Sequence, residues 1–410
     1  MRNQHGPILI AGAGCAGLSL ATHLLDVLGF DREIILVEPR ARHEYTNDRT
    51  WSGFGTKRHR FSGLISKKWN SWKCLTGDGA ARSGSERYSY ESIRAIDFFD
   101  QCLQELESDP RVRMFHEHRV FDRGGGEFAV TDNMFNESEL LRPSHTFDSR
   151  PPRQSYFNGG LHDILLWQQF AGIEVIADSD CFDADTVTLM DFRITQGGSI
   201  RFMYVLPFSR RHALVEATTF TQVPEPSGEL LNDVRSYLRS VYGLNQWHVK
   251  RMESGQIPMS TAQIITNPEP HVTRIGILGG LARPSTGYAF AAIQEHSRQI
   301  AKRIGRGEVP ELSKAKPVSR VLDRIFLSYL ARFPKEAPSL FLRMASRTNP
   351  DRFARFMMNS GNAADILSMI MSMPKTPFIA EAWRSKDIWL LRKKTAATLE
   401  QISVRSAMRL

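Results

Sequence analysis

The sequence contains few cysteines and no long apolar run. Its 410 residues include only 4 cysteines, none of which forms a C-x-x-C pair or lies in a cluster of histidines. Scattered thiols of this kind predict reduced cysteines and no metal site. No apolar stretch approaches the roughly 18 residues that a membrane-spanning helix needs. The N-terminus also lacks the apolar core of a signal peptide, so we expect a cytoplasmic protein.

Acidic residues are sparse in the last quarter of the chain. Residues 311–410 carry 18 Lys and Arg but only 8 Asp and Glu, whereas the whole chain has a net charge of +9. The preceding residues are therefore close to neutral. A basic region of this kind favours an anionic partner, either nucleic acid or an anionic lipid surface. A solvated basic face without a partner fits the charge equally well.

Hydrophobic periodicity predicts a mixed α/β chain. A buried strand at 7–11, a helix at 16–28 and a second strand at 33–37 form a βαβ unit, which predicts a parallel sheet. Between 187 and 220 the period of the apolar residues changes to two, which predicts antiparallel strands of a second sheet. From 316 onward no strand pattern is present, so we expect a helical tail that is interrupted at its prolines.

The first strand runs directly into a glycine-rich turn. Residues 12–17 read Gly-Ala-Gly-Cys-Ala-Gly, which fits G-x-G-x-x-G between a strand and a helix. The first glycine permits the tight turn, the second lets the backbone approach a pyrophosphate, and the third brings helix and strand together. Glu38 follows Gly17 by 21 residues, where a carboxylate can accept hydrogen bonds from ribose hydroxyls and disfavours NADP. The predicted dinucleotide contacts are Gly12, Gly14, Cys15, Ala16, Gly17 and Glu38.

A second glycine-rich turn favours FAD over NAD as the dinucleotide. We expect a buried strand over 274–279, a turn, and a helix over 288–304. A turn this far from the first suits the other end of a long dinucleotide, because the dipole of its helix favours an anionic reduced flavin. An ordinary strand–helix turn is the alternative. The predicted flavin contacts are Gly279, Gly280, Arg283, Pro284 and Gly287.

One acidic residue occupies an apolar strand. In the segment 213–220, alternation puts Glu216 on one face between Leu214 and Phe220. A carboxyl group between apolar side chains is poorly solvated, so its pKa should rise and it can stay protonated near neutrality. Such an acid can give a proton to a substrate without polar groups and take one back. On the pattern alone, a solvated glutamate on an edge strand is the commoner interpretation.

Two further charged residues share a strand face. Asp191 and Arg193 alternate with apolar residues, so their side chains project together. They join Glu216 as candidate catalytic residues, although a structural ion pair at a sheet surface explains the pattern at least as well.

These elements predict an α/β fold in three parts. A Rossmann-like FAD-binding domain is expected to be discontinuous, with an antiparallel-sheet substrate domain inserted into it and a helical basic region after it. The predicted boundaries are 1–60, 92–185 and 270–310 for the FAD-binding domain, 61–91 and 186–269 for the substrate domain, and 311–410 for the helical region.

Several segments together resemble the FAD-dependent lycopene cyclase family of bacteria and plants, which is related to the flavin hydroxylases. The resemblance runs nearly end to end and is most specific in the second glycine turn. The acidic signature of the family is often written F-L-E-E-T, and Glu216 matches its first acid. Here Leu214 and Val215 replace Phe-Leu, and Ala217 replaces the second acid. The segments that carry the resemblance are 47–51, 166–172, 190–193, 204–208, 214–218 and 279–288.

The resemblance implies a lycopene β-cyclase activity without net oxidation. Glu216 would protonate a ψ end of lycopene, and ring closure and loss of a proton would give γ- and then β-carotene. Reduced FAD would stabilise the cation, with NAD(P)H as a candidate source of its electrons. Because lycopene lies in the bilayer, the resemblance implies peripheral docking of the basic helices, including residues 389–394, on an anionic membrane surface. Nucleic acid is the weaker partner, since no recognition motif accompanies the charge.

Three other functions remain open. A flavin monooxygenase or reductase of the same fold would consume NAD(P)H stoichiometrically. In the hydroxylases a Gly-Asp pair usually stands where this chain has Gly279-Gly280, which favours the cyclases. A cyclase of another polyene or prenyl substrate would use the same chemistry, and a non-catalytic flavin or lipid carrier would make Glu216 dispensable.

Overall fold

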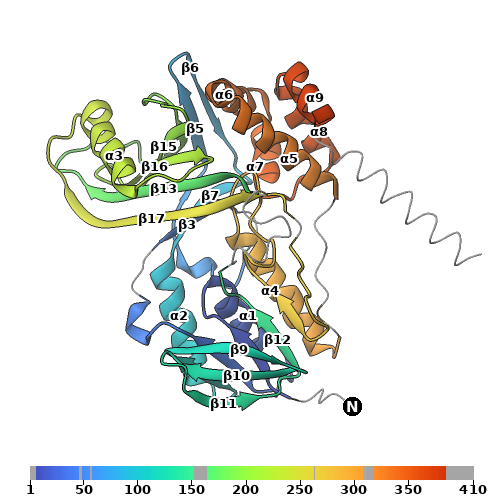
Figure 1. Ribbon diagram of the computed structural model, residues 1–410. Coiled ribbons are helices and arrows are strands. Elements are labelled where there is room, and N and C mark those ends of the chain that lie inside the picture. The colour runs from blue at the N-terminus through green and yellow to red at the C-terminus, as the bar shows by residue number, and fades with distance from the viewer. Residues whose placement is uncertain are drawn as a thin grey trace, which may run out of the picture.

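Three parts make up the chain: a parallel sheet with its covering layers, a larger and mostly antiparallel sheet, and a group of helices beside the larger sheet (Figure 1). The computed structural model describes residues 6–45, 49–55, 58–151, 164–262, 264–308, 310 and 317–384. Within these ranges, no helix combines the length and the apolarity needed to cross a membrane. Residues 47, 48 and 389–394, which the sequence analysis singled out, lie outside them.

Short apolar strands build the five-stranded parallel sheet, in the order β18-β12-β1-β2-β8. Every residue of β1 and β2 is buried, as continuous apolar runs predict for strands that are covered on both faces. The strands are β1 (Ile8–Ala11), β2 (Ile34–Glu38), β8 (Val112–His116), β12 (His145–Asp148) and β18 (Val272–Arg274).

Different layers cover the two faces of the parallel sheet. Three helices pack on one face through apolar side chains such as Leu20, Phe98 and Ile300. A three-stranded antiparallel sheet covers the other face, with Val120 and Phe128 in contact with it. The helices are α1 (Cys15–Leu25), α2 (Ala95–Ser108) and α4 (Phe290–Gly305), and the covering strands are β9 (His118–Gly124), β10 (Glu127–Asp132) and β11 (Glu137–Leu141).

The larger sheet has seven strands in the order β17-β13-β16-β15-β14-β5-β6. Its neighbours are antiparallel except for β14 and β5, which are parallel. Helix α3 (Ser227–Tyr242) covers one face, and the other face contacts the C-terminal helices. The strands are β5 (Ser71–Thr76), β6 (Gly79–Gly84), β13 (Ile164–Ile176), β14 (Thr186–Asp191), β15 (Ile200–Pro207), β16 (His212–Thr221) and β17 (His248–Ser260).

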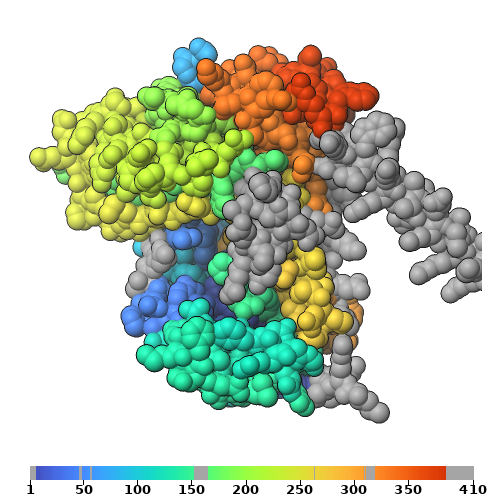
Figure 2. All heavy atoms as spheres, viewed as in Figure 1, coloured from blue at the N-terminus to red at the C-terminus, as the bar shows by residue number. Residues whose placement is uncertain are grey.

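The C-terminal helices and a small antiparallel sheet complete the structure. In Figure 2 the helices form the orange and red surface, and β9–β11 form the teal surface at the opposite end. Asp365 on α8 accepts two hydrogen bonds from Arg355 on α7, at 2.8 and 2.7 Å, which joins these helices. The remaining elements are β3 (Thr50–Gly55), β4 (Ile65–Trp69), β7 (Ser89–Arg94), α5 (Pro317–Arg332), α6 (Ala337–Arg347), α7 (Pro350–Met357), α8 (Ala363–Ser372) and α9 (Lys375–Arg384).

The predicted class is confirmed: a parallel sheet with an inserted antiparallel sheet and C-terminal helices. Two details differ from the prediction. The expected strand over 274–279 is wrong, because β18 ends at Arg274 and a turn follows, with Gly276 at φ +67°. Strand β13, which the sequence boundary at 185 assigned to the dinucleotide domain, pairs with β16 and β17 in the larger sheet.

Candidate active site

The first glycine turn joins β1 to the N-terminus of α1. Gly12 has a φ of +95°, in the left-handed region that favours glycine. At Gly17 a Cβ atom would lie 2.0 Å from the carbonyl oxygen of Gly12, so turn and helix are in close contact there. At Gly14, by contrast, a Cβ atom would meet nothing within 4 Å. The turn is therefore closed toward the protein and open at the start of α1, which suits an anionic pyrophosphate.

Glu38, the last residue of β2, lies against this turn. One carboxylate oxygen accepts a hydrogen bond from the Ala13 amide at 2.7 Å, and the other accepts one from Arg40 Nε at 2.7 Å. The second oxygen also accepts a hydrogen bond from the Arg40 amide at 3.3 Å. The first oxygen has room for a further hydrogen bond, so it can receive a ribose hydroxyl. In the same turn, burial raises the pKa of the Cys15 thiol to about 12, so this side chain is neutral at physiological pH.

The second glycine turn packs directly on the first. A Cβ atom at Gly276 would lie 2.7 Å from the Cβ atom of Ala16. Gly279 is equally confined, since a Cβ atom there would lie 2.6 Å from a backbone carbonyl oxygen of β18. A Cβ atom at Gly280 would meet nothing within 4 Å, as at Gly14. The two turns thus adjoin, and each has a glycine with open space beside it, where a dinucleotide can approach the backbone.

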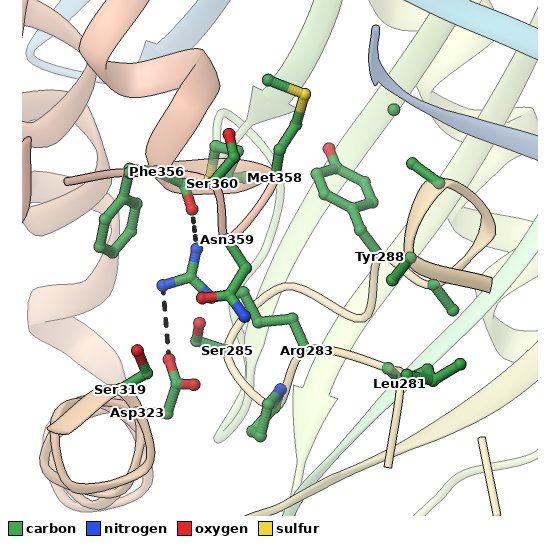
Figure 3. Close-up of a pocket in the computed structure, with 18 of the residues that line it drawn as sticks. Leu281, Arg283, Ser285, Tyr288, Ser319, Asp323, Phe356, Met358, Asn359 and Ser360 are labelled. Atoms are coloured by element: carbon green, nitrogen blue, oxygen red, sulfur yellow. Dashed lines mark hydrogen bonds and ion pairs between the residues drawn. The ribbon is translucent and has the colours of Figure 1, made fainter. Parts of the chain in front are cut away.

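Arg283 is held by the C-terminal helices (Figure 3). Its guanidinium lies 3.5 Å from the carboxylate of Asp323 on α5, donates a hydrogen bond to the Phe356 carbonyl oxygen, and stacks 4.2 Å from the centre of the Phe356 ring. Burial lowers the pKa of Arg283 and raises that of Asp323, while the attraction between the two opposes both shifts. The predicted flavin contact therefore braces the second turn against α5 and α7.

A cavity of about 2540 Å³ lies between the second turn, β3 and helices α4, α5, α8 and α9. Pro284 and Tyr288 line it from the second turn, and Trp51 and Ser52 line it from β3. Gly287, at φ +71°, reverses the chain just before Tyr288. Typical small-molecule sites occupy roughly 300–1,000 Å³, so this cavity has room for a cofactor and a long substrate. Its wall is rich in methionines: Met357, Met358, Met369, Met371 and Met373.

Glu216 is buried in the seven-stranded sheet, opposite a glycine. Its partner on β13 is Gly172, and the partner of Gly172 on β17 is Glu253, so these residues form one row across three strands. A Cβ atom at Gly172 would lie 2.5 Å from Glu216 Cγ. Glu216 Oε1 is buried and has no hydrogen-bond partner among the described residues. The pKa of Glu216 lies well above its ordinary value, first because of burial and second because Glu253 faces it.

The hydrogen bonds that Glu253 accepts converge on one of its two carboxylate oxygens. Oε2 accepts hydrogen bonds from the Thr50 amide at 2.9 Å, from the Thr50 hydroxyl at 3.1 Å, and from Arg251. Arg251 also donates to Glu174 on β13. Donors of this kind suit an ionised carboxylate. The row therefore pairs a carboxyl group that burial favours as neutral with a carboxyl group that accepts three hydrogen bonds on one oxygen.

One buried tyrosine and two partly buried ones connect the Glu216 row with the cavity. Tyr204 on β15 is the cross-strand partner of Glu216. The hydroxyl of Tyr90 lies 2.9 Å from that of Tyr204 and 3.0 Å from that of Tyr288, which lines the cavity. Glu216 is not among the lining residues. Its row is linked to the cavity wall through Tyr204, Tyr90 and Tyr288.

The structure does not bring Asp191 and Arg193 together with Glu216. Asp191 accepts hydrogen bonds from Arg193 at 2.9 and 2.7 Å and from the Tyr237 hydroxyl of α3 at 2.6 Å. Tyr237 packs on the α3 side of the sheet, whereas Leu214, which shares a strand face with Glu216, packs on the other side. The sheet therefore separates Asp191 and Arg193 from Glu216. The two residues form the structural ion pair that the sequence pattern left open as the alternative to a catalytic role.

The roles of Gly172, Glu253 and the tyrosine hydroxyls could not be predicted from the sequence pattern. Gly172 and Glu253 lie in segments whose local pattern gives a strand but not its partners. The pairing of β13 with both β16 and β17 makes them neighbours of Glu216, and this pairing depends on tertiary structure. An isolated glycine inside a strand was the available signal, because such a glycine often marks a place of close approach.

Comparison with solved structures identifies the class of fold as that of flavoproteins. A geranylgeranyl bacteriochlorophyll reductase-like protein of Thermoplasma acidophilum superposes with a TM-score of 0.58 at 14% identity, covering 91% of this chain and 97% of that one. A flavoprotein/dehydrogenase of Cytophaga hutchinsonii gives 0.57 at 13% identity, covering 92% and 98%. A flavin-dependent halogenase of Xanthomonas campestris gives 0.55 at 12% identity, covering 97% and 96%. At these identities the similarity shows the fold alone.

Sequence comparison gives the family. Residues 7–382 match the family model described as lycopene cyclase protein, so the chain belongs to the lycopene cyclase family. A lycopene beta-cyclase of Pseudescherichia vulneris is 26% identical over 210 residues, which is 48% of this chain and 53% of that protein. A chloroplastic neoxanthin synthase of Solanum tuberosum is 24% identical over 319 residues, 73% of this chain and 60% of that protein. The chain thus spans about half the length of the first relative.

The raised pKa of Glu216 predicts a pH-dependent effect on stability. Above its ordinary pKa near 4.5, the unfolded chain releases the proton that the folded chain keeps, so rising pH favours unfolding until Glu216 ionises in the folded protein. A glutamine cannot ionise. We therefore expect the melting temperature of Glu216→Gln, relative to wild type, to increase from pH 5 to pH 8, as thermal unfolding would measure. The exposed Glu336→Gln is the control, and a pH-independent difference for Glu216→Gln would contradict the assignment.

Proposed function

We propose that this chain cyclises the ψ ends of lycopene to β rings, giving γ- and then β-carotene without net oxidation. The observation that carries the proposal is the buried Glu216, a carboxyl group favoured in its protonated form within a member of the lycopene cyclase family. A protonated acid in apolar surroundings is the group that this reaction needs, because its substrate is a hydrocarbon with no polar group to activate.

The two glycine turns support FAD as the cofactor. Gly12, Gly14 and Gly17 at the start of α1 would hold the pyrophosphate, and Glu38 would bind the adenosine ribose. Gly279 and Gly280, in the adjoining second turn, would contact the flavin end. When bound in its reduced form, FAD supplies a negative charge that stabilises a nearby cation.

The proton cycle is assigned to Glu216. Its carboxyl group gives a proton to the terminal double bond of the ψ end, which leaves a carbocation and a carboxylate. The chain of the polyene closes to a six-membered ring, and the ring then returns one proton to the carboxylate. Atoms and electrons balance, because the product is an isomer of the substrate and Glu216 ends in its starting state.

The cavity suits a long apolar substrate. Its size leaves room for a long chain, and the methionines in its wall provide polarizable apolar surface. The ψ end would approach the Glu216 row from the side of Tyr288, which lines the cavity and is joined to that row through Tyr90 and Tyr204. Trp51 and Tyr288 present aromatic faces there, which can stabilise a developing cation.

We further propose that the cavity opens toward an anionic membrane surface through α8 and α9. Ile370, Met371 and Ile379 are largely exposed and also line the cavity, and Trp383 on α9 is 74% exposed. Apolar side chains at the rim of an apolar cavity would let a hydrocarbon pass from lipid without meeting water. The surplus of basic residues over 311–410 favours an anionic leaflet.

Flavin binding is tested at Gly14. A Cβ atom at this position meets no protein atom within 4 Å, so Gly14→Ala should keep its melting temperature. The methyl group would occupy the space assigned to the pyrophosphate, so we expect FAD binding to weaken at least about tenfold, measured by fluorescence titration. Gly63→Ala, also unobstructed, is the matched control. Equal FAD affinity of wild type and Gly14→Ala would exclude this binding mode.

Activity is tested in cells that accumulate lycopene. Expression of the chain should turn them from red to orange, and purified protein with reduced FAD should form β-carotene without stoichiometric NAD(P)H consumption. Loss of the proton donor in Glu216→Gln should lower turnover by about 100-fold or more. Glu336→Gln should match wild type. An oxygenated product with one NADPH consumed per turnover would identify a monooxygenase instead.

Membrane docking is tested with vesicles. The double variant Ile379→Glu/Trp383→Glu should sediment less with phosphatidylglycerol vesicles than wild type, because it puts charge on the apolar rim. Leu28→Glu, at a 99% exposed position far from the rim, should sediment like wild type. If the double variant sediments like wild type, or if it changes only the oligomeric state, the rim formed by α8 and α9 is not the docking surface.

A further inference from the structure

We propose that Glu253 is the positioning residue that keeps the proton on Glu216, and that the bare backbone of Gly172 lets the two carboxyl groups meet across β13. The inference deepens the proposed function and rests on it for the chemistry, although its structural part can be tested without a substrate. It assigns a role to a second acid from β17, in a chain where Ala217 occupies the position next to Glu216.

The row across β16, β13 and β17 brings the two acids into line with each other on either side of Gly172. Strands on either side of β13 are two strand spacings apart, roughly 9–10 Å between backbones. Long glutamate side chains can cover that gap only if the residue between them has no side chain. Gly172 is that residue, and a Cβ atom there would come within 2.5 Å of Glu216 Cγ and 3.2 Å of its Oε1. Alanine at 172 would therefore displace Glu216.

The two acids have opposite surroundings, which divides their roles. The donors of Glu253, from Thr50 on β3 and Arg251 on β17, converge on its Oε2. That oxygen is saturated, so the other side of the carboxylate is available to Glu216. Glu216 differs: its Oε1 is buried and has no hydrogen-bond partner among the described residues. The negative charge is thus fixed on Glu253 and the proton on Glu216.

The other charged or titratable groups around the row leave this division in place. Arg251 attracts the Glu216 carboxylate, but this effect is smaller than those of burial and of Glu253. The guanidinium of Arg251 is engaged by Glu253 and by Glu174 of β13. The phenol groups that face the row or join it to the cavity stay neutral, because burial raises the pKa of each of them. They are Tyr204 on β15, Tyr90 on β7 and Tyr288 after the second turn.

A fixed negative neighbour also favours completion of the proton cycle. Once Glu216 has given its proton to the substrate, two carboxylates face each other in a buried site, and their repulsion raises the affinity of Glu216 for the proton that the ring must lose. Glu253 neither gives nor takes a proton in this cycle, and acts only through Glu216.

The decisive variant is Glu253→Gln, which removes the charge and keeps the shape. Infrared spectroscopy of the full chain without substrate should detect a protonated carboxyl band at neutral pH that is lost in Glu216→Gln. In Glu253→Gln the same band should titrate at a pH lower by about one unit or more, because the opposing charge is gone and Arg251 is released. Asp233→Asn, on α3 at the opposite face, is the control and should leave the band unchanged.

Turnover gives the second measurement. Activity requires protonated Glu216 and is lost as pH rises through the pKa of Glu216. In Glu253→Gln the alkaline limb of kcat should therefore move to lower pH by the same amount as the infrared titration. At pH values below this shifted limb, the activity of the variant should recover. An unchanged infrared titration and an unchanged limb in Glu253→Gln would overturn the inference. If the band shifts but wild type forms no cyclised product from lycopene, the carboxyl pair stands and the proposed function fails.

Discussion

The register of β13 between β16 and β17 is the constraint on which the candidate site depends. Side chains alternate along a strand, so a slip of one residue would bring Ala171 or Ile173 opposite Glu216 and fill the space above Gly172. The pairing runs unbroken from Trp167 to Ile176 against β16. Apolar residues on both faces hold it there, because a slip would also expose one core and bury polar groups in the other.

Local spacing was enough to predict those parts of the site that are close in sequence. Gly12, Gly17 and Glu38 belong to one βαβ unit, and the Ala13 amide does donate to Glu38. Alternation also assigned Glu216 to an apolar strand face, but it left a solvated edge-strand glutamate as the commoner interpretation, and the structure shows that Glu216 is buried. These features follow from the short-range geometry of strands and turns, which the amino-acid pattern encodes directly.

Features that depend on tertiary pairing could not be predicted in this way. The apolar residues Ile275 and Leu278 are buried, as expected, but in a turn rather than a strand, because burial alone does not distinguish the two. Asp191 shows the same difficulty. Alternation predicts which neighbouring residues share its strand face, but it does not predict whether Asp191 and Glu216 lie on the same side of the sheet. Glu253 had no local signal at all.

The C-terminal helices are integral to the site rather than appended to it. Arg283, a basic residue in a glycine turn, suggests an anion contact when the turn is considered alone. In the folded chain its charge is met by Asp323 of α5, and its plane is covered by Phe356 at the end of α7. A buried ion pair loses its compensation when one partner is removed, so the second turn and α5 are energetically tied.

The order of the strands has a consequence for synthesis on the ribosome. The parallel sheet takes β1, β2, β8 and β12 from the first part of the chain, but its edge strand β18 begins at Val272, after the last strand of the larger sheet has been made. Contacts between segments so far apart in sequence form slowly, because a long loop must close first. Until β18 has been synthesised, the edge of the parallel sheet at β12 is therefore unpaired in the nascent chain, and an unpaired edge of this kind is prone to aggregation.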